Sequence, residues 1–103
     1  MSLQLQDLLM ETSPLAQKIV HFYAGQYGRD NDAICDKIID YFLRRDVDVE
    51  ESQREALQGS QAILAFYAER FSRAPNEILD TILVVFTRYD PDFDTSAFAT
   101  TLT

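Results

Sequence analysis

The sequence contains an internal repeat, in which residues 16–50 align without a gap onto residues 60–94. Repeats of this length are supersecondary units that cannot bury their apolar face alone, so two copies are expected to pack against each other. An extended array normally needs three or more units, so the repeat favours a closed domain. Thirteen of the 35 aligned pairs are identical: Gln17/Gln61, Ile19/Ile63, Phe22/Phe66, Tyr23/Tyr67, Ala24/Ala68, Arg29/Arg73, Ile34/Ile78, Asp36/Asp80, Ile38/Ile82, Phe42/Phe86, Arg44/Arg88, Asp46/Asp90 and Asp48/Asp92.

Residue spacing and capping residues predict that the first copy is a pair of helices. Ser13 directly precedes Pro14, a pairing typical of a helix start, and Gly28 is a natural helix stop. Asp30 or Asn31 can cap a second helix that runs to about residue 45. Apolar residues recur every three or four positions along the first of these helices, at Leu15, Ile19, Phe22, Tyr23 and Tyr27.

The second copy is predicted to hold a long helix over roughly 49–72 and another over about 75–89. Pro75 suits the first position of the latter helix, which is apolar on nearly all sides and should be buried. A short N-terminal helix is expected over about 3–11.

These patterns predict an all-α fold, namely a compact bundle of two duplicated helical hairpins related by a pseudo-two-fold axis, with a short N-terminal helix. One domain should span residues 1–103, with repeats at about 4–46 and 48–90 and a short C-terminal tail. Composition agrees, since 3 glycines and 3 prolines in 103 residues are few chain breakers and 47% of residues are hydrophobic.

The net charge of −8 argues against direct binding to nucleic acids or anionic membranes, which would repel the chain. The N-terminus shows no signal-peptide pattern and no apolar run approaches 18 residues, so we expect a cytoplasmic protein without a membrane partner. The acids concentrate in two segments, 30–51 and 74–103, and predict an acidic surface at Asp36, Asp40, Asp46, Asp48, Asp90 and Asp92.

The repeated Asp-x-Asp pattern at Asp46, Asp48, Asp90 and Asp92 has the spacing that opens an EF-hand calcium loop. The remaining loop positions lack the required glycine and glutamate in both copies. Turn formation and helix capping are therefore the preferred interpretation of these acids, and no metal is predicted.

His21 and Cys35 are the only histidine and the only cysteine in the chain. They are 14 positions apart, which is no metal-binding spacing, and no sequence neighbour would activate either group for catalysis. Both are absent from the second copy, so we expect no cofactor and no enzymatic activity.

Two further repeated pairs suggest a structural role. Arg29 and Arg73 fall in the turn of each hairpin, whereas Asp36 and Asp80 fall one turn into the following helix. An arginine–carboxylate bridge that closes each hairpin would explain both repeats.

Three functional hypotheses remain. The first is a helical protein–protein interaction module (an adaptor, regulator or assembly factor), expected to form a homodimer through aromatic helix surfaces. The second is a small-ligand binder or enzyme with a cleft between the repeats, and the third is an acidic mimic that inhibits a basic, nucleic-acid-binding surface. The residues expected at the interface or cleft are Phe22, Tyr23, Phe66, Tyr67 and His21.

Overall fold

The computed structural model describes residues 5–89, which form six α-helices and no strand. The prediction of an all-α fold is therefore confirmed for this part of the chain. The helices are α1 (Leu5–Met10), α2 (Pro14–Tyr27), α3 (Asn31–Arg45), α4 (Glu51–Ala56), α5 (Ser60–Phe71) and α6 (Pro75–Tyr89).

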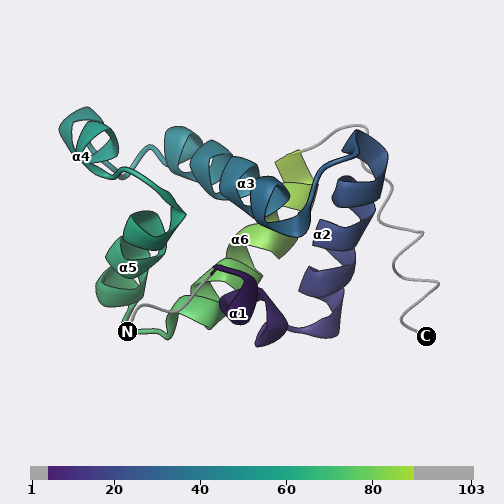
Figure 1. Cartoon of the computed structure of the whole chain (residues 1–103). Coiled ribbons are helices and arrows are strands. Elements are labelled where there is room, and N and C mark those ends of the chain that lie inside the picture. The colour runs from purple at the N-terminus through teal and green to yellow at the C-terminus, as the bar shows by residue number, and fades with distance from the viewer. Residues whose placement is uncertain (1–4, 90–103) are drawn as a thin grey trace.

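Helices α3 and α6 pack against each other at the centre of the molecule, and each also contacts both α2 and α5. In Figure 1, α2 lies on the right of this central pair and α5 on the left. The short helix α1 contacts α2, α3 and α6, while α4 lies beyond the end of α3 and above α5 in Figure 1. The outer helices α2 and α5 thus occupy opposite flanks of the same central pair.

The core is a single cluster of apolar side chains to which every long helix contributes. Val20, Ile39, Leu64 and Leu83 come from α2, α3, α5 and α6, and each is almost completely buried. Full burial of such a side chain stabilises the fold by roughly 1.5–3 kcal/mol relative to leaving it exposed. Helix α6 packs against α1, α2, α3 and α5, which accounts for its unusually apolar sequence.

Local sequence signals account for most helix ends. The Ser13 hydroxyl accepts a hydrogen bond from the Ala16 amide at 3.2 Å, and the Asp30 carboxylate accepts one from the Ala33 amide at 2.8 Å. Helix α6 begins at Pro75, as predicted. Each capping side chain satisfies a backbone N–H that the helix itself leaves without a partner.

The prediction of one continuous helix over 49–72 is wrong, because the chain leaves the helical path between α4 and α5. Leu57 ends α4 in an extended conformation (φ −85°, ψ 96°), and Gly59 follows with φ 88° and ψ 152°. Such a backbone is accessible to glycine and strained for other residues. The half-buried Leu57 side chain packs against the core, which holds the chain at this bend.

Helices α2 and α5 end in the same way. Gly28 and Ser72, which occupy corresponding positions of the repeat, both adopt left-handed backbone conformations, with φ 63° and 54°. The amide of the next residue, Arg29 or Arg73, donates to the carbonyl of Ala24 at 3.1 Å or Ala68 at 3.0 Å. This arrangement satisfies carbonyls that would otherwise be free at the helix end.

The left-handed Ser72 provides a stability prediction. A non-glycine residue pays a steric penalty in this conformation, so Ser72→Gly should raise the free energy of unfolding by about 0.5–1 kcal/mol. Gly28→Ala should lower the free energy of unfolding by a similar amount. Urea denaturation of both variants checks the pair, and a loss of stability in Ser72→Gly would contradict the prediction.

Candidate functional site

The repeated tyrosines Tyr23 and Tyr67 each pack against a phenylalanine of the other repeat. The Tyr23 ring of α2 meets the Phe86 ring of α6 edge-on, with 5.4 Å between centroids and 71° between planes. The Tyr67 ring of α5 meets the Phe42 ring of α3 at 5.5 Å and 74°. Because Phe42 and Phe86 also correspond in the repeat, the two contacts are reciprocal.

A second aromatic ring lies parallel to each of these tyrosines, one helical turn further along the chain. Tyr27 stacks on Tyr23, and Phe71 stacks on Tyr67, both with centroids 6.0 Å apart and planes 2° apart. The outer rings remain accessible, with 59% of Tyr27 and 55% of Phe71 exposed. Each outer helix therefore presents a stacked aromatic pair, with one ring in the core and one at the surface.

These aromatic pairs line two shallow grooves on opposite flanks of the molecule. The first groove, beside α2, has a volume of about 230 Å³, and the second groove, beside α5, has a volume of about 430 Å³. The first is formed by Tyr23, Tyr27, Ile34, Lys37, Ile38, Tyr41 and Phe86. The second is formed by Tyr67, Phe71, Arg73, Ile78, Thr81, Ile82 and Phe42. Six lining residues of one groove correspond to six of the other at the 44-residue spacing of the repeat.

Cationic side chains border both grooves, although the chain as a whole is acidic. Lys37 lines the first groove, and the Arg45 guanidinium lies 4.5 Å from the centre of the Tyr41 ring. Arg73 lines the second groove, and the Arg70 guanidinium lies 6.0 Å from the centre of the Phe71 ring. Apolar walls with a positive rim suit an apolar or aromatic side chain, particularly one with an acidic neighbour.

The Tyr67 hydroxyl donates a hydrogen bond of 2.6 Å to the Asp46 carboxylate, which follows α3. Burial and this hydrogen bond raise the pKa of Tyr67 well above its ordinary value. The phenol therefore stays protonated at neutral pH and serves as a hydrogen-bond donor rather than as a base. The same Asp46 accepts a bond from the Asp48 amide at 3.0 Å, which is the turn predicted for these acids.

The structure does not bring His21 together with the two tyrosines. His21 is exposed on α2 and lines a third hollow, shared with Asp30 at the start of α3. Tyr23 and Tyr67 face different grooves. The single cleft expected near His21, Tyr23 and Tyr67 is thus replaced by separate cavities. Phe22 and Phe66 pack edge-on against their neighbouring tyrosines, with centroids 5.5 and 5.2 Å apart.

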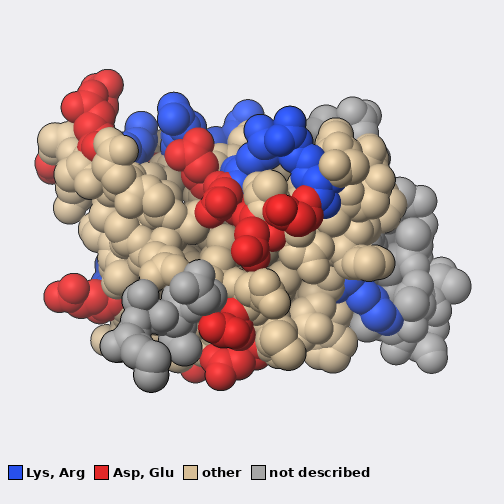
Figure 2. All heavy atoms as spheres, viewed as in Figure 1, with Lys and Arg blue, Asp and Glu red and all other residues tan. Residues whose placement is uncertain are grey.

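The acids predicted to form one surface have diverse surroundings. Asp36 and Asp40 are exposed on α3, where Asp40 pairs with Arg44 at 2.7 Å. Asp46 is half-buried and Asp48 is exposed. Figure 2 shows Lys and Arg gathered along the upper edge of this face, over α3, with Asp and Glu mostly below them. The other two predicted acids, Asp90 and Asp92, lie outside the described residues.

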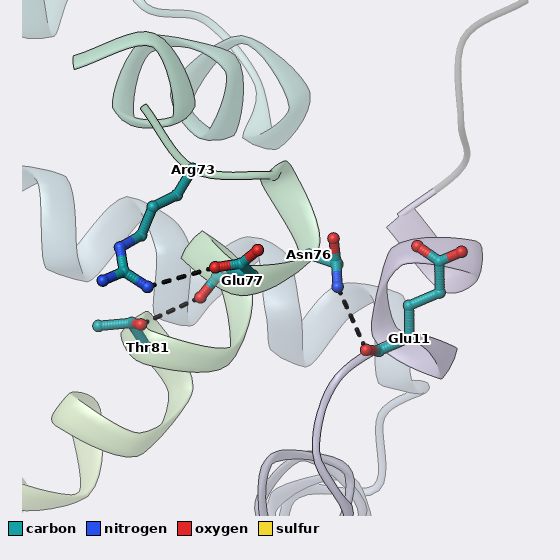
Figure 3. A network of polar contacts seen from close by, with 5 residues as sticks. All are labelled: Glu11, Arg73, Asn76, Glu77 and Thr81. Carbon is teal, nitrogen blue, oxygen red and sulfur yellow. Dashed lines mark hydrogen bonds and ion pairs between the residues drawn. The ribbon is translucent and has the colours of Figure 1, made fainter. Parts of the chain in front are cut away.

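The predicted Arg73–Asp80 bridge is wrong. Asp80 accepts hydrogen bonds from the Ser13 amide at 2.7 Å and the Ser13 hydroxyl at 3.0 Å, and so joins α6 to the start of α2. Arg73 instead pairs with Glu77 at 3.2 Å (Figure 3).

Asp36 has the corresponding role in the other half of the molecule. In place of the predicted closure by Arg29, it accepts a hydrogen bond from the Ser60 hydroxyl at the start of α5. Each central helix therefore holds the first turn of an outer helix through its repeated aspartate. Figure 3 also shows Asn76 of α6 donating to the Glu11 carbonyl, a bond of 3.3 Å that ties α6 to the end of α1.

Cys35 is completely buried on α3. Burial raises the pKa of its thiol to about 12, with Asp32 and Asp36 acting in the same direction. The thiol is therefore protonated at neutral pH, which removes the nucleophilic thiolate.

This shift predicts an alkaline loss of stability. The unfolded thiol ionises near pH 9, whereas the folded thiol keeps its proton up to about pH 12. Its contribution to stability is thus complete below pH 9 and is lost as pH rises through that window. Between pH 8 and 10.5, the free energy of unfolding should fall by roughly 1–2 kcal/mol less in the Cys35→Ala variant than in the parent protein. Equal losses in denaturant titrations of the two proteins would contradict this expectation.

Within residues 5–89, no group of three or more His, Cys, Asp or Glu side chains is placed to hold a metal ion. None of the helices described is long and apolar enough to cross a bilayer. Comparison with protein-family models, curated proteins and solved structures gave no match.

The groove walls include residues that had not been selected from the sequence as site residues. Tyr27, Tyr41, Phe42, Phe71 and Phe86 all line one groove or the other. The repeat alignment did contain a signal for four of them, since Phe42 matches Phe86 and Tyr27 matches Phe71. Their role emerges only when the central and outer helices pack.

Proposed function

We propose that the protein is a non-catalytic, acidic helical module for protein–protein interaction, acting as an adaptor, regulator or assembly factor. The observation that carries this proposal is the pair of corresponding aromatic grooves, each with an accessible ring, Tyr27 or Phe71, at its edge. Accessible aromatic rings beside apolar cavities are typical of protein interfaces. The inert Cys35 and the protonated Tyr67 give no comparable support to a catalytic function.

The proposal includes a duplicated architecture with a pseudo-two-fold axis through the α3–α6 contact. In support, α3 and α6 have bounds that differ by 44 positions at both ends. Tyr23–Phe86 and Tyr67–Phe42 are reciprocal contacts, and the corresponding Asp80 and Asp36 each bind a serine near the start of an outer helix. An internal two-fold axis would give the module two similar binding surfaces on opposite flanks.

The proposed partner in the first instance is a second copy of the same chain, in the cytoplasm. In a two-fold dimer the same patch of each copy faces its counterpart, and we propose that an aromatic groove provides this patch. The accessible rings Tyr27 and Phe71 would lose most of their exposed area on association, which is the main source of affinity in such contacts.

Size-exclusion chromatography with light scattering tests this proposal. At high micromolar concentration the expected mass is twice the 11.8 kDa of one chain. A strict monomer under those conditions would contradict the homodimer. The interaction proposal would then depend on other proteins that bind the grooves directly.

The two other hypotheses receive less support from the geometry. A shared ligand cleft would need Tyr23, Tyr67 and His21 to converge, yet they line three different cavities. An acidic mimic would need a continuous carboxylate face, whereas Asp40 and Asp46 are engaged in intramolecular contacts.

A further inference from the structure

The junction between α4 and α5 has weaker helix-stopping signals than the junctions that precede α2, α3 and α6. Ser13 and Asp30 cap α2 and α3 with their side chains, and prolines begin α2 and α6. Gly59, which precedes α5, has no side chain to cap that helix. The separation of α4 from α5 therefore depends on the backbone conformations of Leu57 and Gly59.

The conformation of Gly59 is one that residues with a Cβ atom rarely adopt, with φ 88° and ψ 152°. A Cβ atom added at this position would meet no other atom within 4 Å, so only the backbone conformation opposes a larger residue. Residues 51–71 contain no proline and a single glycine, Gly59. A larger residue at this position would therefore favour one continuous helix through α4 and α5.

Straightening this junction would move α5 away from α3. Helix α4 lies beyond the end of α3 (Figure 1), where the Arg54 guanidinium donates to the Asp46 carbonyl at 2.8 Å and Val49, just before α4, is buried. No residue of α4 is itself buried, so this helix can lengthen without breaking core contacts of its own. A helix that continues in the direction of α4 would carry the buried Leu64 and Tyr67 out of the core. Because their exposure to water is unfavourable, a straightened chain needs another apolar surface for α5.

A second copy of the chain offers the surface that a displaced α5 requires. Helix α6 packs on α1, α2 and α3, and α5 packs on α3 and α6. The connection between α1–α3 and α5–α6 runs through residues 46–59. Helices α5 and α6 of one copy can therefore replace those of another and form the same core contacts, so that only the connection changes.

We propose that residues 57–59 are a hinge at which α4 and α5 join into one helix, and that the straightened chain exchanges α5 and α6 with a second copy. In this exchanged dimer, the core contacts between α1–α3 and α5–α6 form between copies. The exchange does not use the aromatic grooves, and it is independent of the proposed function.

Gly59→Ala in the full chain tests the hinge, because alanine opposes the bend and favours a helix. After refolding at high micromolar concentration, the dissociation constant should be at least roughly 30-fold lower than that of the parent protein. The matched control is Gly28→Ala, at another glycine with positive φ (63°) and no atom within 4 Å of an added Cβ. Its backbone is the same in both forms, so the dissociation constant should change by less than about threefold. Sedimentation equilibrium measures all three proteins.

A proline at position 60 should reverse the effect of Gly59→Ala. Ser60 is the first residue of α5, a position that accepts proline, whereas the interior of a continuous helix does not. Adding Ser60→Pro to Gly59→Ala should therefore raise the dissociation constant by roughly tenfold or more. The Ser60 hydroxyl also donates to Asp36, so Gly59→Ala with Ser60→Ala is the control and should remain dimeric.

The exchange itself is detected by isotope-filtered nuclear Overhauser spectra of Gly59→Ala, refolded from equal amounts of labelled and unlabelled chains. The Tyr23 and Phe86 rings lie 5.4 Å apart, and in the exchanged dimer their contact should appear between copies. Association through the grooves would leave this contact within one copy, and Phe71→Glu should weaken only that association. An unchanged dissociation constant in Gly59→Ala, or a dimer in which the Tyr23–Phe86 contact stays within one copy, would overturn the hinge proposal and leave the proposed function intact.

Discussion

Replacing Tyr67 by alanine is expected to lower the free energy of unfolding by about 3–5 kcal/mol, as for other large buried aromatic side chains. Tyr67 is only 1% exposed and packs against Phe42, Phe66 and Phe71. Its removal leaves a cavity between α3, α5 and α6, and it deprives the half-buried Asp46 carboxylate of a hydrogen bond. Urea denaturation at pH 7 measures the loss.

The control variant Tyr67→Phe separates ring packing from the hydrogen bond. It keeps the aromatic contacts and removes only the hydroxyl, so the expected loss is about 1–2 kcal/mol. If Tyr67→Ala lowers the free energy of unfolding by less than about 1 kcal/mol, this ring is not part of a packed core.

The second large effect is expected on association. Phe71→Glu places a charge at the edge of the second groove, where the aromatic ring is 55% exposed. If the grooves mediate dimerisation, the substitution buries an unpaired carboxylate in the interface and should raise the dissociation constant by roughly 30-fold or more. Because the ring is partly exposed, stability should change by less than about 1 kcal/mol. Sedimentation equilibrium measures the dissociation constant.

Val47→Glu is the matched control for that experiment. It makes the same change in charge at an apolar side chain that is 88% exposed and lines neither groove. The dissociation constant should therefore change by less than about threefold. Equal weakening by both variants would indicate a general effect of net charge and would argue against the groove.

The all-α fold and most helix ends could be predicted because local signals determine them. Ser13, Gly28 and Pro75 act through their own backbone and hydrogen-bonding preferences, which a sequence displays directly. The break between α4 and α5 does not follow from the sequence, although Gly59 lies directly before α5. An apolar spacing of seven residues from Leu57 to Leu64 fits a continuous helix equally well, and only packing of Leu57 against the core separates the alternatives.

The grooves illustrate the limit of the repeat as a guide to sites. The alignment identified Tyr23 and Tyr67 as corresponding residues, yet it could not show that each pairs with a phenylalanine of the other copy. The alignment also does not identify the serines that bind the repeated Asp36 and Asp80. Ser13 and Ser60 are 47 positions apart rather than 44, so they are not aligned with each other in the two copies.

Whether the two grooves mediate association is measured most directly by aromatic NMR spectra of the full chain over a concentration series that spans the dimerisation midpoint. We expect concentration-dependent shifts at Tyr27, Phe71 and the aromatic side chains beside them in the grooves, with the His21 ring unchanged. Shifts confined to other surfaces, or spectra independent of concentration together with a monomeric mass, would contradict the proposed role of the grooves.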